Sequence, residues 1–220
     1  MIISYVLLIF SQTGASLTDI TVLLMALTPP LLILAWVLNV DKNRTLTFRM
    51  VKVFLLGVGI TAIAGVLNDY LIGSTNRAFL AGITEESLKY LVLFWYVSKR
   101  GLINEPMDAI VYGVLVSLGF AALENISYLA RSDVYETTGV IRAFTAVPLH
   151  AMCGIIMGFY FGLAKFHARQ YNFAKALLIP MSIHASYNFI TDFGYLYALL
   201  FVVALFIFTQ RIHKSYVSLQ

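Results

Sequence analysis

Long stretches of this chain are dominated by hydrophobic residues, and short polar intervals separate them. A helix needs roughly 20 residues to cross a hydrocarbon core of about 30 Å. Seven apolar stretches approach that length, and each predicts a membrane-spanning helix: 18–39, 50–71, 78–97, 107–130, 142–164, 174–193 and 195–210. The connections are short and contain no repeat or low-complexity linker. The pattern predicts an all-α polytopic membrane protein, a bundle of about seven transmembrane helices forming one domain over residues 1–220.

The first ten residues are also apolar, but they are too short to span a membrane and lack the basic start of a signal peptide. We expect them to form an interfacial or packing extension. The composition agrees with a membrane protein: 60% of residues are hydrophobic, 12% are charged and the mean hydropathy is +0.84. This leaves too little polar surface for a soluble globule of 220 residues. One cysteine, Cys153, excludes an internal disulfide and a CxxC site.

The 15 lysines and arginines exceed the 11 aspartates and glutamates, but they stand in short groups between apolar segments. This arrangement indicates membrane topology and argues against a nucleic-acid partner. Eleven lie in alternate connections and at the C-terminus: Lys42, Arg44, Arg49, Lys52, Lys99, Arg100, Lys165, Arg169, Lys175, Arg211 and Lys214. The opposite connections hold three: Arg77, Arg131 and Arg142. By the positive-inside rule we expect the C-terminus in the cytoplasm and the N-terminus outside.

Six ionisable residues lie within the predicted spans, away from the helix ends: Glu85, Glu86, Lys89, Glu124, His150 and His184. Such residues are costly in a membrane and are functional candidates by default. Four different helices place one of them six to ten residues from the outer end, roughly 10–15 Å deep at 1.5 Å per residue. Each also has a purely structural explanation, such as an ion pair between Glu85 and Lys89 on one helix face. Four structural coincidences at one depth are less plausible than one shared site.

Two hydrolytic mechanisms suit this set of side chains. In the first, which the ligand count favours, Glu124, His150 and His184 bind zinc, and Glu85 or Glu86 takes the proton from water. In the second, a glutamate activates water without a metal, and His150, His184 and Asn188 stabilise the oxyanion. Because Glu85 and Glu86 point about 100° apart on a helix, they cannot share one role. We expect Glu85 to pair with Lys89 and Glu86 to act as the base.

Four motifs resemble those of the PrsW family of bacterial intramembrane proteases, from about residue 79 to 190: EESLK, GFAALEN, VPLHAMCGIIMGFYFG and HASYNFI. The family is more distantly similar to the CAAX-prenyl endoproteases. The resemblance implies an intramembrane endopeptidase of the bacterial plasma membrane. It also implies regulated, first-site cleavage of a single-pass membrane protein, such as an anti-sigma factor, near the extracytoplasmic face. The fourth motif has Asn188 where the type case of the family has aspartate, and the Asn188 amide could only coordinate a metal weakly or donate a hydrogen bond.

By the same resemblance, the motif positions would carry the functional roles. They are Glu85, Glu86, Lys89, Glu124, His150, His184 and Asn188.

Two other classes of protein also place polar residues inside membranes. An ion-coupled transporter would use buried carboxylates and histidines as a proton relay, but the sequence lacks the internal symmetry typical of such proteins. A receptor or scaffold would use them only to hold helices together. Gly154, Gly158 and Gly162, spaced four residues apart, predict a close contact between two helices.

Overall fold

The computed structural model describes residues 16–40, 47–73, 78–167 and 170–217, which form helices with no strand among them. In chain order the helices are α2 (Leu17–Val40), α3 (Phe48–Leu71), α4 (Ala81–Leu91), α5 (Pro106–Ala130), α6 (Tyr135–Phe144), α7 (Ala146–Phe166), α8 (Tyr171–Thr191) and α9 (Tyr195–Val217). A 3-10 turn at Ala78–Leu80 leads into α4, and a π-helical segment at Val92–Ser98 continues it. The all-α prediction is confirmed. The predicted extension at residues 1–10 lies outside the described part.

Helices occupy all seven ranges that the sequence predicts as spans. By length and apolar composition, four described helices can cross a membrane: Thr18–Asn39, Phe48–Leu71, Pro106–Ala130 and Tyr135–Phe166. The apolar segment Tyr195–Gln210 is shorter. The helices α4 and α8 are not among the four, because α4 is short and α8 carries polar residues between its apolar ones. These two helices supply charged or imidazole side chains to the site described below.

The predicted span 142–164 begins differently in the structure. Helix α6 occupies the start of this region, and α7 begins only at Ala146, after a break at Thr145 with φ −121° and ψ −72°. Pro148 then falls in the first turn of α7, where its missing N–H needs no partner. The apolar pattern is continuous across the break, so hydropathy alone does not reveal it.

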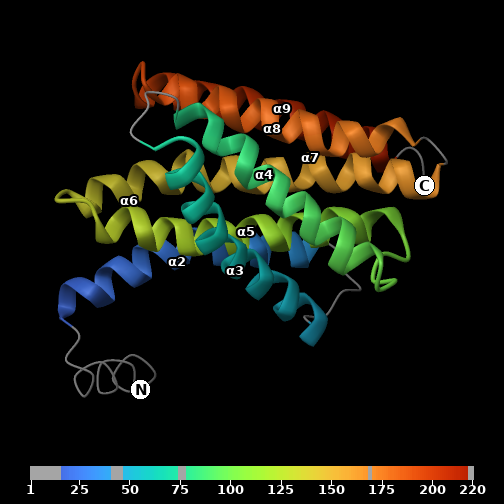
Figure 1. Ribbon diagram of the computed structural model, residues 1–220, viewed down its shortest axis with the longest axis horizontal. Helices are drawn as coiled ribbons and strands as arrows, with labels where there is room; N and C mark the ends of the chain where they lie inside the picture. Colours follow the sequence, from blue (N-terminus) through green and yellow to red (C-terminus); the bar gives the residue numbers. More distant parts are fainter. Residues whose placement is uncertain (1–15, 41–46, 74–77, 168–169, 218–220) are drawn as a thin grey trace.

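Helix α5 lies at the centre of the bundle and contacts α7, α3 and α2; in Figure 1, α3 crosses in front of α5 and α2 passes behind it. Most of its side chains are buried, from Asp108 to Leu129. Its start is fixed by a reciprocal capping interaction between Glu105 and Asp108, with Pro106 at the first helical position. A helix that is apolar on all sides is covered either by other protein elements or by lipid, and the side chains of α5 are covered by protein. Helix α5 is therefore the core on which the remaining helices pack.

The glycine series on α7 forms the close contact with α5 that the sequence predicts. A Cβ atom on Gly154 would strike Gly113 and Ser117, one on Gly158 would strike Ala109 and Ile110, and one on Gly162 would approach Pro106. Contacts of this kind are enriched in membrane proteins because small residues let two backbones approach closely. The contact fixes α7 against α5, and with it the relative positions of His150 and Glu124.

Candidate active site

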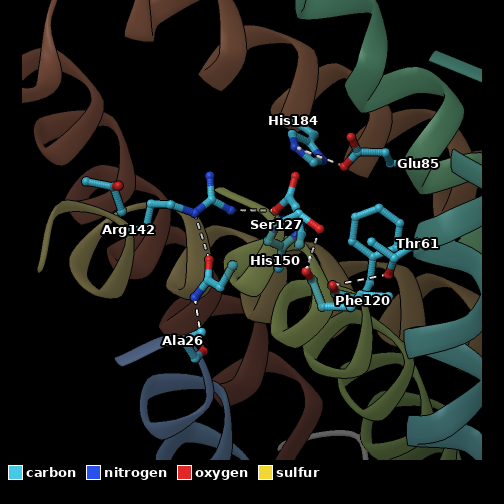
Figure 2. A network of polar contacts seen from close by, with 12 residues as sticks. Ala26, Thr61, Glu85, Phe120, Ser127, Arg142, His150 and His184 are labelled. Atoms are coloured by element: carbon cyan, nitrogen blue, oxygen red, sulfur yellow. Dashed lines mark hydrogen bonds and ion pairs between the residues drawn. The ribbon is translucent and has the colours of Figure 1, made fainter. Parts of the chain in front are cut away.

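The six ionisable residues predicted to share a site come together between α4, α5, α7 and α8. Glycine makes the approach of α4 to α8 possible, because a Cβ on Gly82 would lie 2.8 Å from the backbone nitrogen of Ala185 and 2.9 Å from the carbonyl carbon of His184. Glu85 and Glu86 follow Gly82 by about one turn and so face His184. Figure 2 shows Glu85 beside His184, with His150 and Arg142 directed toward the same region.

Glu86 and Lys89 form a fully buried ion pair within α4. The Lys89 Nζ atom donates to Glu86 Oε1 at 2.7 Å, and both side chains have no exposed surface. His184 Nδ1 lies 2.9 Å from the same carboxylate oxygen. Because a carboxylate can only accept here, His184 donates through Nδ1, which leaves a lone pair on its Nε2 atom. Glu86 thus orients the His184 ring.

The expected pairing of Lys89 with Glu85 is therefore not what the structure contains. Both carboxylates lie on the same side of α4 as Lys89, at three and four residues' distance, so spacing alone does not choose between them. Contacts with the neighbouring helices determine which of the two glutamates pairs with Lys89. The Lys89 ammonium also lies 2.8 Å from His150 Nδ1 and 4.3 Å from the centre of the Phe120 ring. These contacts draw it into the interior, where Glu86 is located.

His150 connects Lys89 to Glu124. Since an ammonium only donates, Nδ1 of His150 accepts from Lys89, and its Nε2 carries the hydrogen that is donated to Glu124 Oε2 at 2.8 Å. The two imidazole rings are close, with centroids 4.9 Å apart in an edge-to-face arrangement. His150 is therefore held on both ring nitrogens by residues from other helices.

Glu85 and Glu86 each have one buried oxygen, Oε2, without a hydrogen-bond partner among the described residues, but of the two only Glu85 lines the cavity described below. The Oε1 atom of Glu85 accepts from Asn68 Nδ2 at 3.4 Å. The Oε2 atom of Glu85 lies 3.7 Å from His184 Nε2, which carries the lone pair. A buried acceptor without a partner is costly and points to a missing donor such as water or a cation.

Arg142 binds Glu124 and its neighbour Asn125. Arg142, on α6, donates from Nη2 to Glu124 Oε2 at 2.6 Å and from Nε to Asn125 Oδ1 at 2.7 Å. Asn125 donates in turn to the carbonyl oxygen of Ala26 on α2 at 3.3 Å. Arg142 stands at the first position of the predicted span 142–164 and is counted with the basic residues of the connections, so the sequence gives no signal of its role in the site.

A cavity of about 730 Å³ leads from this cluster to one end of the bundle. Of the predicted site residues, Glu85, Glu124, His150, His184 and Asn188 line it, whereas Glu86 and Lys89 do not. At the end of the bundle it is bordered by exposed residues of the helix connections: Gly73, Arg131, Asp192 and Tyr195.

Two further residues, Asn68 and Gly82, belong to this site but cannot be predicted from the sequence. An amide such as Asn68 is common near the end of a helix, and a single small residue such as Gly82 before the two glutamates indicates no function. Each becomes relevant only through what the neighbouring helix places beside it.

Comparison with known proteins agrees with this architecture. A family model described as "PrsW family intramembrane metalloprotease" matches residues 47–210, which include every residue of the cluster. The chain belongs to the PrsW family of intramembrane proteases. No solved structure matches the chain.

Curated PrsW proteins are similar over most of the length. Protease PrsW of Shouchella clausii (strain KSM-K16) is 31% identical over 204 residues, 86% of this chain and 93% of that protein. Protease PrsW of Clostridioides difficile (strain 630) is 29% identical over 208 residues, which cover 86% of this chain and 87% of that protein. Protease PrsW of Geobacillus kaustophilus (strain HTA426) is 42% identical over 136 residues, but this match spans only 59% of each chain.

The metalloprotease description of the PrsW family can be tested against the donor atoms present. Glu85, His150 and His184 offer ligand atoms that all lie within 4.8 Å of one another. The predicted set contains Glu124 in place of Glu85. Two ligands about 2.1 Å from a tetrahedral zinc ion lie about 3.4 Å apart, close to the 3.7 Å between Glu85 Oε2 and His184 Nε2. These two atoms fit a divalent metal, and His150 completes the set once one of its ring nitrogens leaves its partner.

Proposed function

We propose that this chain hydrolyses a peptide bond of a membrane-anchored substrate at the end of the bundle reached by the cavity, with Glu85 as the carboxylate that binds the attacking water. The observation that carries the proposal is the unpaired Oε2 atom of Glu85 in the cavity wall. A general base must lie within hydrogen-bond reach of the proton that it takes, and a free carboxylate oxygen in a cavity satisfies this requirement. Glu86 is sealed behind Lys89 and His184, which makes it the less suitable base.

The other polar residues have supporting roles in this proposal. Glu86 fixes the His184 ring through Nδ1, so that Nε2 stays directed toward Glu85. Lys89 neutralises Glu86 in the interior and holds His150. Asn188 lines the cavity one helical turn after His184, where its amide can donate to the carbonyl oxygen of the scissile bond.

We also propose zinc as the cofactor, with Glu85, His150 and His184 as its ligands; if zinc is bound, Glu85 would hold the attacking water through the metal and would not accept its proton directly. Two nitrogen donors and one carboxylate are a known ligand set for catalytic zinc. Zinc in such a site lowers the pKa of bound water and polarises the carbonyl group. The carboxylate of Glu86 behind His184 matches the usual partner of a zinc-bound histidine.

One observation favours the metal-free alternative. Both ring nitrogens of His150 already have partners, Lys89 and Glu124, so this ring has no free lone pair in the structure. In that case Glu85 activates water by itself, and His150, His184 and Asn188 serve as hydrogen-bond and electrostatic support. The metal content of the purified protein separates the two mechanisms.

For the substrate we propose a single-pass membrane protein, such as an anti-sigma factor, cut near the extracytoplasmic face of the plasma membrane. The proposal is supported by the position of the cavity mouth. It lies among connections with few basic residues, which the positive-inside rule assigns to the outside. Because an intact helix buries its carbonyl groups in backbone hydrogen bonds, the cut segment must be unwound, as it can be at the end of a transmembrane helix.

The experiment is co-reconstitution of the purified chain with a panel of single-pass anti-sigma factors tagged at both ends. We expect a fragment pair from at least one member, cut in or just beyond the outer end of its transmembrane helix as mapped by mass spectrometry. Glu85→Gln should abolish these fragments. Cuts confined to the cytoplasmic half, or cutting that survives Glu85→Gln, would contradict the proposal.

A further inference from the structure

We propose that Arg142 is a positioning residue of the active site, which holds the Glu124 carboxylate where it fixes the His150 ring. The inference rests on the proposed function for its catalytic consequence. Its structural part, the Arg142–Glu124–His150 chain of contacts, can be tested without activity.

Arg142 is held in a single orientation by three groups on α5. It donates to Glu124 and Asn125 through two different nitrogens, and its guanidinium carbon lies 3.9 Å from the centre of the Tyr128 ring. Its side chain is 12% exposed and that of Glu124 is 14% exposed. An arginine placed between two acceptors and an aromatic face has little freedom, and its planar fork suits this geometry better than an ammonium would.

Glu124 transmits this restraint to His150 through a shared atom. Its Oε2 atom accepts both from Arg142 at 2.6 Å and from His150 Nε2 at 2.8 Å. Without the arginine, the carboxylate is free to rotate toward the cavity that it lines. His150 would then lose the acceptor for its Nε2 hydrogen and keep only Lys89 on its other nitrogen. The ring would no longer have one defined orientation.

A second contact of Arg142 is structural, and the two contacts can be separated. Through Asn125, which donates to the carbonyl oxygen of Ala26, the arginine also joins α6 to α2. A lysine at position 142 can neutralise Glu124, but its single ammonium cannot also bind Asn125 in the same geometry. Arg142→Lys should therefore keep the catalytic contact and lose the structural one, whereas Arg142→Gln loses the ion pair.

The test compares these variants with a matched control, Arg100→Gln, which removes an exposed arginine stacked on Tyr96 at 4.5 Å. We expect Arg142→Gln to lower kcat about 10- to 100-fold with KM nearly unchanged, since small displacements of catalytic groups cost this much. Arg142→Lys should restore kcat to within about fivefold of the wild type. In a Glu124→Gln background, Arg142→Gln should have almost no further effect, because coupled residues are not additive.

Three results would overturn the inference: equal losses from Arg142→Gln in both backgrounds, a lysine variant as inactive as the glutamine variant, or an effect on KM alone. The ¹⁵N NMR spectrum of histidine-labelled protein in detergent supplies the readout without activity. In metal-free protein it should show His150 as the Nε2–H form in the wild type and in Arg142→Lys, and an altered His150 signal in Arg142→Gln. An unchanged signal in Arg142→Gln refutes the contact chain. Absence of cleavage by the wild type refutes only the proposed function.

Discussion

At the scale of single residues, the two adjacent glutamates of α4 have different environments. Glu86 is paired through Oε1 with Lys89 and His184 and does not line the cavity, whereas Glu85 lines the cavity and, among the described residues, has no ion pair with Lys89. Removing one partner of a buried ion pair leaves an uncompensated charge, which is strongly destabilising. Removing the charge from an unpaired buried carboxylate relieves a desolvation cost. Stability and activity should therefore respond differently to substitution at the two positions.

We predict that Glu86→Gln lowers the free energy of unfolding by about 3–5 kcal/mol, because it leaves the Lys89 ammonium buried without its counter-ion. In metal-free protein, Glu85→Gln should keep or raise the melting temperature, and it should abolish cleavage. Thermal unfolding in detergent, read beside the cleavage assay, checks both variants. Equal destabilisation by the two substitutions would show that the carboxylates share one structural role.

At the scale of helices, small residues decide which elements can meet. The glycines of α7 let α5 approach closely, and Gly82 lets α4 approach α8 beside His184. The contact made by the α7 glycines can be predicted from the sequence, because the glycines recur every four residues. The contact made by Gly82 cannot be predicted in this way, because a single glycine shows no periodicity. The break between α6 and α7 is likewise hidden, since both sides of Thr145 are apolar.

We predict that Gly158→Ala destabilises the protein by about 1–3 kcal/mol, because its methyl group would overlap the backbone of α5 at Ala109 and Ile110. Gly59→Ala is the matched control, since a Cβ there meets no atom within 4 Å. This control should be neutral or slightly stabilising, as alanine is the better helix former. Melting temperatures in the same detergent compare the two. A Gly158→Ala protein as stable as the control would mean that α5 and α7 can separate without cost.

At the scale of the whole molecule, the ends of the bundle differ in charge and in access to the site. The cavity mouth lies at the end bordered by Gly73, Arg131 and Asp192, and the groups of basic residues lie mainly in the other connections. The distribution of charge predicts the orientation of the bundle in the membrane. This orientation determines which face of the membrane supplies the substrate.

We predict that a reporter fused after Gln220 behaves as cytoplasmic and that one inserted after Asp133, in the exposed connection between α5 and α6, behaves as extracytoplasmic. Paired fusions, one active only in the cytoplasm and one only outside, provide the measurement. If the two sites report the same side or the reverse order, the proposed extracytoplasmic cut loses its support.

For the metal, we predict about one equivalent of zinc per chain in protein purified without chelator, and loss of both zinc and cleavage in His184→Ala. His167→Ala is the control, because this exposed histidine lies outside the cluster and should leave the zinc content unchanged. Elemental analysis and cleavage before and after chelation check the prediction. Full activity after complete removal of metal would favour direct activation of water by Glu85.

The sequence by itself determines that this chain is a helical membrane protein and that its buried ionisable residues meet. The reason is energetic: an ionisable group within an apolar helix is tolerated in a polar interior or a water-filled cavity, and one shared site for Glu85, Glu124, His150 and His184 is the simplest way to meet this condition at one depth. Motif order and spacing also identify the family. These conclusions depend only on which residues occur at which positions along the chain, and the sequence gives those positions directly.

Only the tertiary structure decides which of these groups pair. Lys89 binds Glu86 although spacing permits Glu85 equally, because His150 and Phe120 from other helices surround its ammonium. Arg142 and Asn68 reach the site from segments whose pattern gives no indication of it. Partner choice depends on the rotation and closeness of neighbouring helices, and these follow from packing around α5, where contacts between residues far apart in the chain set the geometry.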